Sequence, residues 1–309
     1  MIELKVDKEN DTVCYNDEHH IYWDKNDLFT YISVTTIIGL YEQEFDKQFW
    51  LQYKAFQKLC SPTKDVLENL RELAVFDRKV LSTRYPKLAT KEFDDMINQI
   101  NSEWKQTNKE ACEKGTNVHA GYENKFDEKG WYGLSWYGFD KDKKFLYIPN
   151  CYKISQKINR QVIPEMLVSM KTKSGVRIAG QIDLAVKDCK DLFIEDYKTN
   201  KELKFESYRK PSGKYTMMKE PLSHLMDCNM SHYQLQLSLY QYMVRRIYPW
   251  LKPNHLTIIH VSNGISLRHV VDYLERDVIN MCCNFRDFHP EFEYKKIIKD
   301  EQGRYWLPR

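Results

Sequence analysis

The sequence predicts a single α/β domain, residues 1–309, built on a central mixed β-sheet with flanking helices. Three observations carry this prediction. Three strand-like segments follow one another over residues 162–199, a strong helical pattern covers residues 231–248, and one more strand-like segment covers residues 255–262. Three antiparallel strands, a helix and a further strand together describe one mixed sheet with helices against it.

Composition and charge are those of an ordinary globular protein. The 309 residues are 42% hydrophobic, which is ample for a core. The 47 Lys and Arg residues nearly balance the 44 Asp and Glu residues, so any nucleic-acid binding must come from local basic patches. No run approaches the ~18 apolar residues of a membrane span, and no signal-like core begins the chain. We therefore expect an intracellular, cytoplasmic protein without membrane contact.

The N-terminal third predicts strands followed by helices. Residues 12–38 combine β-branched and aromatic residues with polar turns, which indicates a small meander of strands. Helically spaced apolar residues then recur across residues 41–114. The last helix of this region is expected to end near Gly115, and a new helix with Thr116 as its N-cap would carry His119.

The rest of the chain is expected to hold the main sheet. Residues 129–150 are rich in glycine and aromatic residues and predict a loop or irregular hairpin, whereas residues 200–220 form a lysine-rich connection. A last helix is predicted over residues 271–288. The expected division of the single domain is N-terminal strands at 1–40, a helical region at 41–114 and the core at 115–309.

An acid pair stands out in residues 180–200, GQIDLAVKDCKDLFIEDYKTN. Two strands joined by the turn KDCKD place Asp183 opposite Asp196, with Lys198 on the same face as Asp196. Facing carboxylates repel each other, and a divalent cation between them converts the repulsion into coordination. Such a cation also lowers the pKa of bound water and polarises a phosphoryl oxygen. The segment therefore predicts a metal-dependent hydrolytic site in which Lys198 holds water or neutralises phosphate charge.

Each of these residues also has a simpler interpretation. Asp183 and Lys198 would form an ordinary cross-strand ion pair, and His119 would be a packed helix residue. The order of four motifs along the chain is more specific than any single residue. The motifs are GTNVHAGYE with His119, AGQID with Asp183, IEDYKT with Asp196 and Lys198, and QLSLY with Gln236 and Tyr240.

This ordered set resembles the RecB-type branch of the PD-(D/E)XK nuclease superfamily. The motif-bearing resemblance covers residues 115–244. The segment YISVTTIIG is also similar to the short Ser-Val-Thr element that precedes the nuclease core in phage exonucleases and in the mitochondrial genome-maintenance exonuclease. The resemblance implies a restriction-endonuclease-like core and a phage or bacterial setting.

The resemblance also implies a metal site. One or two Mg²⁺ or Mn²⁺ ions are expected between Asp183 and Asp196, with His119 and the backbone carbonyl of Tyr197 completing the ligand set. Lys198 is expected to orient the nucleophilic water.

The resemblance also implies roles for residues around the metal ligands. The additional acid of the family maps to Glu165 in IPEMLV, whereas Gln236 and Tyr240 either brace the site or contact the DNA backbone. Several relatives hold an iron–sulfur cluster through one cysteine before the core and three near the C-terminus. Here Cys282 and Cys283 are adjacent and no closely spaced third cysteine follows, so no cluster is expected. The sequence has no GxxxxGK[ST] loop, so no ATP is expected either.

Two segments are candidates for holding DNA. The connection after the D-x-K element is a basic strip that could follow phosphates, or else an ordinary solvated loop. Its candidate contacts are Lys201, Lys204, Arg209 and Lys210. Aromatic residues before the sheet could stack on unpaired bases, although packing within the fold is their commoner role. These residues are Trp131, Tyr132, Trp136 and Tyr137.

The expected activity is metal-dependent hydrolysis of phosphodiester bonds by an exonuclease that works from single- or double-stranded DNA ends in recombination, repair or replication. A structure-specific or flap endonuclease on the same fold is the alternative enzyme. A catalytically inactive DNA-binding subunit is the alternative of another class, although a binder has no need of opposed acids. A helicase or a single-strand annealing or binding protein is the expected partner besides DNA.

Overall fold

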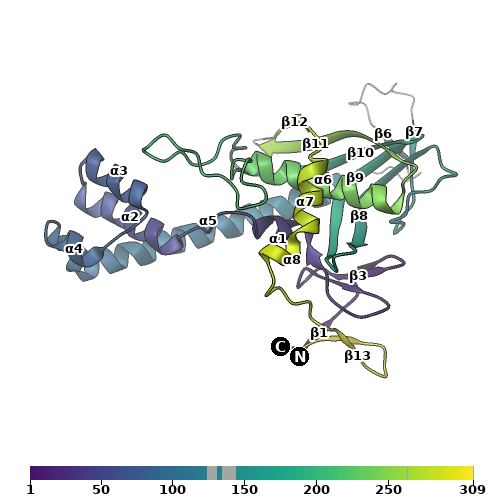
Figure 1. The fold of residues 1–309 in the computed structure, drawn as a ribbon, viewed down its shortest axis with the longest axis horizontal. Coiled ribbons are helices and arrows are strands. Elements are labelled where there is room, and N and C mark those ends of the chain that lie inside the picture. The colour runs from purple at the N-terminus through teal and green to yellow at the C-terminus, as the bar shows by residue number, and fades with distance from the viewer. Residues whose placement is uncertain (124–130, 134–143, 263, 309) are drawn as a thin grey trace.

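The computed structural model describes residues 1–123, 131–133, 144–262 and 264–308. Its main body is an eight-stranded sheet that runs in the order β12-β11-β10-β9-β8-β7-β6, with β5 paired to β9 beside this path (Figure 1). The strands are β5 (Ile32–Ser33), β6 (Trp131–Gly133), β7 (Lys144–Tyr147), β8 (Arg160–Lys171), β9 (Arg177–Asp188), β10 (Asp191–Lys198), β11 (Lys252–Ser262) and β12 (Ile265–Val271).

The sheet is mixed, which confirms the predicted fold class. Strands β8, β9 and β10 are antiparallel neighbours, whereas β11 lies parallel to β10 and β7 lies parallel to β8. Asp191 pairs with Asp188 and Leu192 with Lys187, so the turn between β9 and β10 is centred where the sequence predicted it. This register fixes which residues of the two strands face each other.

Helix α6 (Asn229–Ile247) covers one face of the sheet. Its apolar side, which includes Leu235, Leu239 and Met243, is buried in one core with Ile182 of β9 and Ile258 of β11. Helix α7 (Glu275–Cys283) packs against α6, and α8 (Phe285–Phe288) follows α7 and adds Phe285 to the same core. This layer holds α6 firmly against the centre of the sheet.

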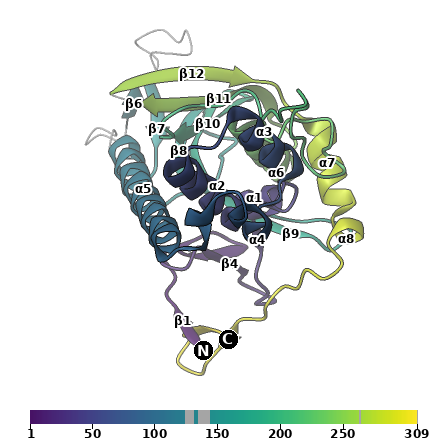
Figure 2. The same cartoon turned by 90° about the vertical axis from the view of Figure 1, so that its left-hand side faces the viewer.

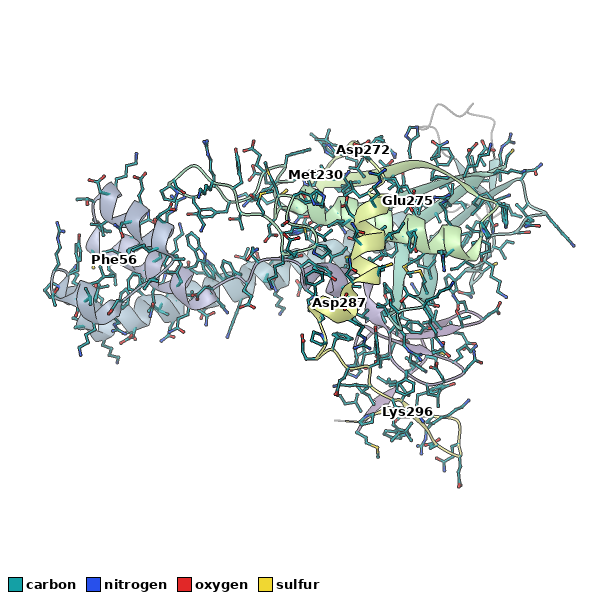
Figure 3. The ribbon with its side chains drawn as sticks, viewed as in Figure 1. Phe56, Met230, Asp272, Glu275, Asp287 and Lys296 are labelled. Atoms are coloured by element: carbon teal, nitrogen blue, oxygen red, sulfur yellow. The ribbon has the colours of Figure 1, made fainter. Side chains whose placement is uncertain are left out.

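A helical arm projects from the body (Figures 1 and 2). It has its own core, in which Phe56 lies far from the sheet (Figure 3). Among the residues that the structure describes, no helix combines the length and the apolar content needed to cross a membrane. The arm consists of α2 (Lys47–Cys60), α3 (Lys64–Leu73), α4 (Arg78–Ser82), the short 3₁₀ helix η1 (Pro86–Ala89) and the N-terminal part of α5 (Lys91–Glu123).

Helix α5 corrects the prediction of two helices divided near Gly115. It is one helix of 33 residues, and the Thr116 hydroxyl donates to the Cys112 carbonyl inside it instead of capping a new helix. A glycine within a helix costs only about 1 kcal/mol, which packing readily offsets. At Gly115 the helix comes close to the end of β10, because an added β-carbon would lie 3.5 Å from the Thr199 hydroxyl oxygen. The unbroken helix connects the arm directly to the sheet.

The N-terminal region corrects a second prediction. Strands β3 (Val13–Asn16) and β4 (Ile21–Asp24) form the expected hairpin, but the segment predicted as its continuation is helix α1 (Val34–Gly39). Ser33 caps this helix by accepting a hydrogen bond from the Thr36 backbone amide at 3.0 Å. The buried side chains of α1 are helically spaced, so the β-branched residues here serve a helix.

The C-terminal region corrects a third prediction. The strand-like segment at residues 255–262 belongs to β11, and β12, which the sequence did not predict, follows it as an antiparallel partner. The predicted helix over residues 271–288 begins only at Glu275 and is divided into α7 and α8 at Asn284. The final strands β13 (Ile298–Lys299) and β14 (Tyr305–Leu307) pair with each other, and β14 pairs with β1 (Ile2–Leu4), so the two termini lie close together (Figure 2).

The N-terminal hairpin is docked on the main sheet by polar contacts. This name covers the hairpin of β3 and β4 together with a third strand, β2 (Lys8–Glu9), which pairs with β3. The Asn10 side chain donates to the Leu167 carbonyl at 2.9 Å, and the Thr12 and Ser169 hydroxyls are 3.0 Å apart. These contacts hold β2 next to the middle of β8.

We predict that Asp24 is a main anchor of this docking. The buried Asp24 carboxylate accepts from the Tyr31 hydroxyl at 2.6 Å and pairs with Lys171 Nζ at 2.7 Å. Burial alone would raise the pKa of Asp24, but Lys171, Tyr31 and two backbone amides outweigh it and lower the pKa. Asp24→Asn is therefore expected to lower the free energy of unfolding by roughly 1.5–3 kcal/mol at neutral pH, measured by urea denaturation.

The effect of Asp24→Asn should depend on pH in a defined direction. A carboxylate with a depressed folded-state pKa stabilises the protein above its unfolded pKa of about 4 and loses this contribution on further acidification. The difference between the wild type and Asp24→Asn should therefore shrink below that pH. Asp11→Asn is the control, because Asp11 forms an exposed ion pair with Lys153. Equal stability of the wild type and Asp24→Asn at neutral pH would refute the anchoring role.

Candidate metal centre

The two opposed acids lie at the end of the β9–β10 pair. The pairing runs to Glu195 opposite Leu184, and Asp196 and Asp183 are the next residues in the same register. Asp183 Oδ2 accepts a hydrogen bond from the Tyr197 backbone amide at 2.7 Å. This bond fixes the direction of the Asp183 carboxylate beside β10.

Asp183 belongs to a group of three potential metal ligands. His119 Nδ1 lies 3.6 Å from Asp183 Oδ2 and 4.0 Å from Glu165 Oε1. One ligand atom from each of the three residues lies within 4.8 Å of the others. His119 comes from the C-terminal end of α5, Glu165 from β8 and Asp183 from β9. Two carboxylates and an imidazole form a donor set that suits a divalent cation.

Glu165 has a backbone conformation that is unusual in a strand. Its φ is 50°, in the left-handed region, whereas Pro164 and Met166 on either side keep their pairing with Leu184 and Ile182. A residue other than glycine pays of the order of 1 kcal/mol for this conformation, and such residues concentrate at functional sites. The strand thus holds Glu165 in place beside Asp183 against a local energetic cost.

Both carboxylate oxygens of Asp196 contact other side chains of the protein. Its Oδ2 lies 2.5 Å from Lys198 Nζ, and its Oδ1 accepts from Gln236 Nε2 at 2.9 Å. Gln236 Oε1 in turn accepts from Lys198 Nζ at 3.1 Å. Tyr233, one turn before Gln236 on α6, presents its ring 4.6 Å from the same ammonium group. The D-x-K element is therefore braced by helix α6.

The electrostatics of the site indicate an excess of negative charge. Burial, reinforced by the neighbouring Asp196, raises the pKa of Asp183 to about 8. Burial would lower the pKa of His119, but Glu165, Asp183 and Asp196 together raise it to about 9. The charge of a divalent cation would relieve both effects, because it stabilises carboxylate anions and a neutral imidazole ligand. The residues present thus fit a metal ion.

Burial opposes a positive charge on Lys198, but Asp196 and Asp183 outweigh it and raise the pKa of this lysine. The side chain therefore keeps its proton near neutral pH. A protonated ammonium can donate hydrogen bonds to a water or a phosphate oxygen, but it cannot accept a proton as a general base.

Tyr240 is buried and packs against β9. A β-carbon on Gly180 would lie 2.7 Å from Tyr240 Cε1, closer than real β-carbon contacts, and 3.0 Å from Val34 Cγ2, which is also tight. Glycine at this position lets α6 approach the sheet closely enough for Gln236 to reach Asp196. Two roles were predicted for Tyr240, bracing the site or contacting the DNA backbone. Its buried position fits the first of them.

Gly180→Ala is expected to destabilise the fold by roughly 1–3 kcal/mol, because the added methyl group pushes Tyr240 and α6 away from β9. Thermal and urea unfolding measure this loss. The same displacement should reduce any activity that depends on Gln236. Gly39→Ala is the matched control, since a β-carbon there meets no atom within 4 Å. A Gly180→Ala variant as stable as the wild type would show that α6 does not need this close approach.

The basic connection runs from the site to the arm. Its four predicted phosphate contacts, Lys201, Lys204, Arg209 and Lys210, are all exposed. Farther along, Tyr208 accepts a hydrogen bond from Arg71 Nε at 2.6 Å and the Ser212 amide donates to Glu72 Oε2 at 2.9 Å, which ties the connection to α3. The predicted aromatic contacts Trp136 and Tyr137, and the side chains of Trp131 and Tyr132, lie outside the described residues.

Two residues near the site were not found from the sequence. Lys8 Nζ of β2 lies 3.6 Å from Glu165 Oε2. Tyr22 of β4 is buried, and its pKa is raised by this burial and by the charge of Glu165. Neither residue belongs to a motif, and each is more than a hundred positions from Glu165, so no local pattern could have placed them here.

A second group, Glu42, Asp227 and His232, also brings its ligand atoms within 4.8 Å of one another. His232 Nε2 lies 2.7 Å from Asp227 Oδ1, and His232 Nδ1 lies 3.4 Å from Glu42 Oε1. Asp227 Oδ2 also accepts from the Gln43 backbone amide at 2.7 Å. These contacts join the connection before α6 to the segment after α1.

Comparisons with known proteins give only distant similarity. No family model and no curated protein matches the sequence. Among solved structures, the protein SSO0001 is 13% identical with a TM-score of 0.31, over 81% of this chain and 89% of that one. A protein from Eubacterium rectale named "putative exonuclease" is 12% identical with a TM-score of 0.28, over 82% of this chain and 90% of that one. Both TM-scores are too low to support a conclusion about this chain.

Proposed function

We propose that the chain is a metal-dependent deoxyribonuclease of the RecB-type PD-(D/E)XK branch, acting as an exonuclease on DNA ends. The observation that carries the proposal is the convergence of two sets of residues. His119, Glu165 and Asp183 offer a ligand set, and the Lys198–Asp196 pair lies on the adjoining strand. A metal position and a cation next to it can together activate a water and stabilise the charge that develops on the phosphoryl group.

Each chain residue has a defined role in this proposal. His119, Glu165 and Asp183 hold the metal, and Asp196 with the Tyr197 carbonyl extends the ligand set. Bound there, Mg²⁺ or Mn²⁺ supplies charge that lowers the pKa of water and polarises a phosphoryl oxygen.

Lys198 keeps its proton and donates to the attacking water or to a phosphate oxygen. Gln236 fixes the direction of both Asp196 and Lys198 through its amide. The Tyr197 backbone amide keeps the Asp183 carboxylate turned toward β10. The protein thus positions the reacting groups before the substrate arrives, which limits the cost of ordering them.

The proposed DNA path follows the exposed basic connection between the site and the arm. Lys201 and Lys204 are nearest to the D-x-K element in sequence, and Arg209 and Lys210 are nearer the contact with α3. Exposed Lys and Arg side chains bind phosphates without reading sequence, so cleavage should be independent of sequence.

The test is digestion of labelled DNA by the full-length protein. The substrates are single-stranded, double-stranded, flapped and circular DNA, each with Mg²⁺, with Mn²⁺ and with excess EDTA. We expect linear DNA to be shortened from an end, circular DNA to remain intact, and EDTA to stop the reaction. Undiminished cleavage with metals removed would refute the metal mechanism. Cleavage of circular or flapped DNA would favour an endonuclease, and binding without cleavage would favour an inactive subunit.

A further inference from the structure

The N-terminal hairpin contributes a cation to the candidate metal centre. Lys8 Nζ lies 3.6 Å from Glu165 Oε2, while the other oxygen of the same carboxylate faces His119. The Lys8 side chain is 23% exposed and that of Glu165 is 12% exposed. Lys8 therefore lies at the boundary between the site and solvent, where a polymeric substrate must approach.

Hydrogen bonds to β3 and β8 anchor the segment that carries Lys8. Its strand pairs with β3 at Tyr15, and the Asp7 backbone amide donates to the Tyr15 carbonyl at 2.9 Å. The Asn10 side chain joins the same segment to the Leu167 carbonyl, two residues beyond Glu165 on β8. A side chain on an anchored strand loses less freedom on binding a ligand than one on a free terminus.

Lys198 and Lys8 differ in how closely each is held by its polar partners. Lys198 contacts both Asp196 and Gln236, and its side chain is 17% exposed. Among the ion pairs of the described residues, Lys8 pairs with Glu165. Its distance of 3.6 Å is longer than that of the Lys198–Asp196 pair, and Lys8 approaches from the solvent side. A partly exposed ion pair adds little to stability and exchanges partners readily. Lys8 can therefore turn from Glu165 to an incoming anion, whereas Lys198 keeps its contacts with Asp196 and Gln236 and has only its remaining N–H for water or phosphate.

We propose that Lys8 binds a phosphate group of the DNA substrate next to the scissile bond. This inference rests on the proposed function and deepens it by adding a substrate-binding residue from a segment outside the nuclease motifs. The proposed site holds three acids, Glu165, Asp183 and Asp196, whose negative charge repels an incoming phosphodiester. Additional positive charge at the solvent side of these acids offsets their repulsion of the phosphate.

The first test measures DNA binding without cleavage. End-labelled single-stranded and duplex oligonucleotides are titrated in Ca²⁺ with the full-length wild type and with Lys8→Met, at several salt concentrations. We expect about a fivefold to tenfold loss of affinity, and a slope of log affinity against log salt that is smaller by about 0.7–0.9, because one phosphate contact is lost. Lys8→Arg should restore both values. Lys5→Met is the control, since the Lys5 side chain is 85% exposed and pairs with Asp7.

The second test separates phosphate binding from positioning of Glu165. Mn²⁺ is titrated into the DNA-free proteins by calorimetry. If Lys8 binds phosphate, Lys8→Met should bind Mn²⁺ at least as tightly as the wild type, because a competing positive charge is removed. Weaker Mn²⁺ binding with unchanged DNA affinity would overturn the proposal and make Lys8 a positioning residue for Glu165.

Unchanged DNA affinity and salt slope in Lys8→Met would also overturn the proposal. Lys8→Gln provides a second neutral variant if the methionine variant does not fold. If the wild type itself fails to bind either oligonucleotide, the proposed function fails and this assignment fails with it. If the wild type binds and cleaves DNA while both neutral variants bind equally well, only the role of Lys8 is refuted.

Discussion

Replacing Asp183 with asparagine is expected to reduce DNA cleavage by more than about a thousandfold while leaving the fold intact. The carboxylate is the central member of the candidate ligand set, so its loss removes the charge that a metal needs. Asparagine has nearly the same shape, and its carbonyl can still accept the hydrogen bond from the Tyr197 amide. The measurement is the initial rate on end-labelled DNA in Mg²⁺ and in Mn²⁺.

The same substitution should not destabilise the metal-free protein. The Asp183 side chain is only 11% exposed and lies beside Asp196, and its raised pKa indicates that the folded state disfavours the anion. Removing one of two repelling groups therefore removes an unfavourable interaction. We expect a Tm in EDTA at least as high as that of the wild type, and loss of the increase in Tm that Mn²⁺ gives to the wild type.

Asp188→Asn is the matched control for this prediction. It is the same chemical change on the same strand, but Asp188 lies at the turn end of β9 and pairs with Arg160. Its cleavage rate and its response to Mn²⁺ should match those of the wild type. A folded Asp183→Asn protein that cleaves DNA at a comparable rate would show that the acid pair has no catalytic role.

The central strands and α6 were predictable because their signals are local. Alternating apolar residues on either side of the polar turn KDCKD fix the hairpin of β9 and β10, and with it the neighbouring positions of Asp183 and Asp196. Gln236 and Tyr240 are four residues apart, so a helix places both on one face. The fold class and this part of the candidate site therefore follow from periodicity within short segments.

The predictions of other elements were wrong because the local sequence there is compatible with two different structures. Val34, Ile37 and Ile38 are β-branched, which favours a strand, but their spacing is that of one helical face and Ser33 supplies the cap. Gly115 suggested a helix end, yet a single glycine costs too little to end a helix that contacts α2 near its start and β10 near its end. In the C-terminal region, the dipeptide Asn263-Gly264 is a hairpin signal that would have predicted β12.

The surroundings of Glu165 could not be predicted, because they depend on contacts between distant segments. Lys8 is 157 residues away along the chain and reaches Glu165 only because the N-terminal hairpin docks on β8. The left-handed backbone of Glu165 follows Pro164 within a regular strand, and no sequence signal distinguishes it from its neighbours. Periodicity predicts elements, whereas the docking of one element on another decides which charged groups meet.

Lys198→Met is expected to lower the cleavage rate by about a hundredfold to a thousandfold while the protein retains its affinity for metal. In the proposed mechanism the ammonium donates to water or phosphate and is not a ligand of the cation, so the proposed metal ligands remain. Without Lys198, Asp196 loses its ionic partner, and a bound cation should compensate for the missing charge. Calorimetry should therefore show Mn²⁺ binding at least as tight as in the wild type, and single-turnover kinetics should show the slower step.

Lys187→Met is the control for Lys198→Met. It distinguishes a slower chemical step from the effect of removing any buried lysine. Lys187 is buried, but it lies at the turn end of β9, four residues beyond Asp183, where its ammonium donates to the Ile158 carbonyl and lies 5.4 Å from the Trp250 ring. Both substitutions remove a buried positive charge, so both can lower Tm, but only Lys198→Met should slow the chemical step. Loss of Mn²⁺ binding in Lys198→Met would contradict the assigned role, because it would mean that the lysine holds the metal site together instead of acting on the substrate.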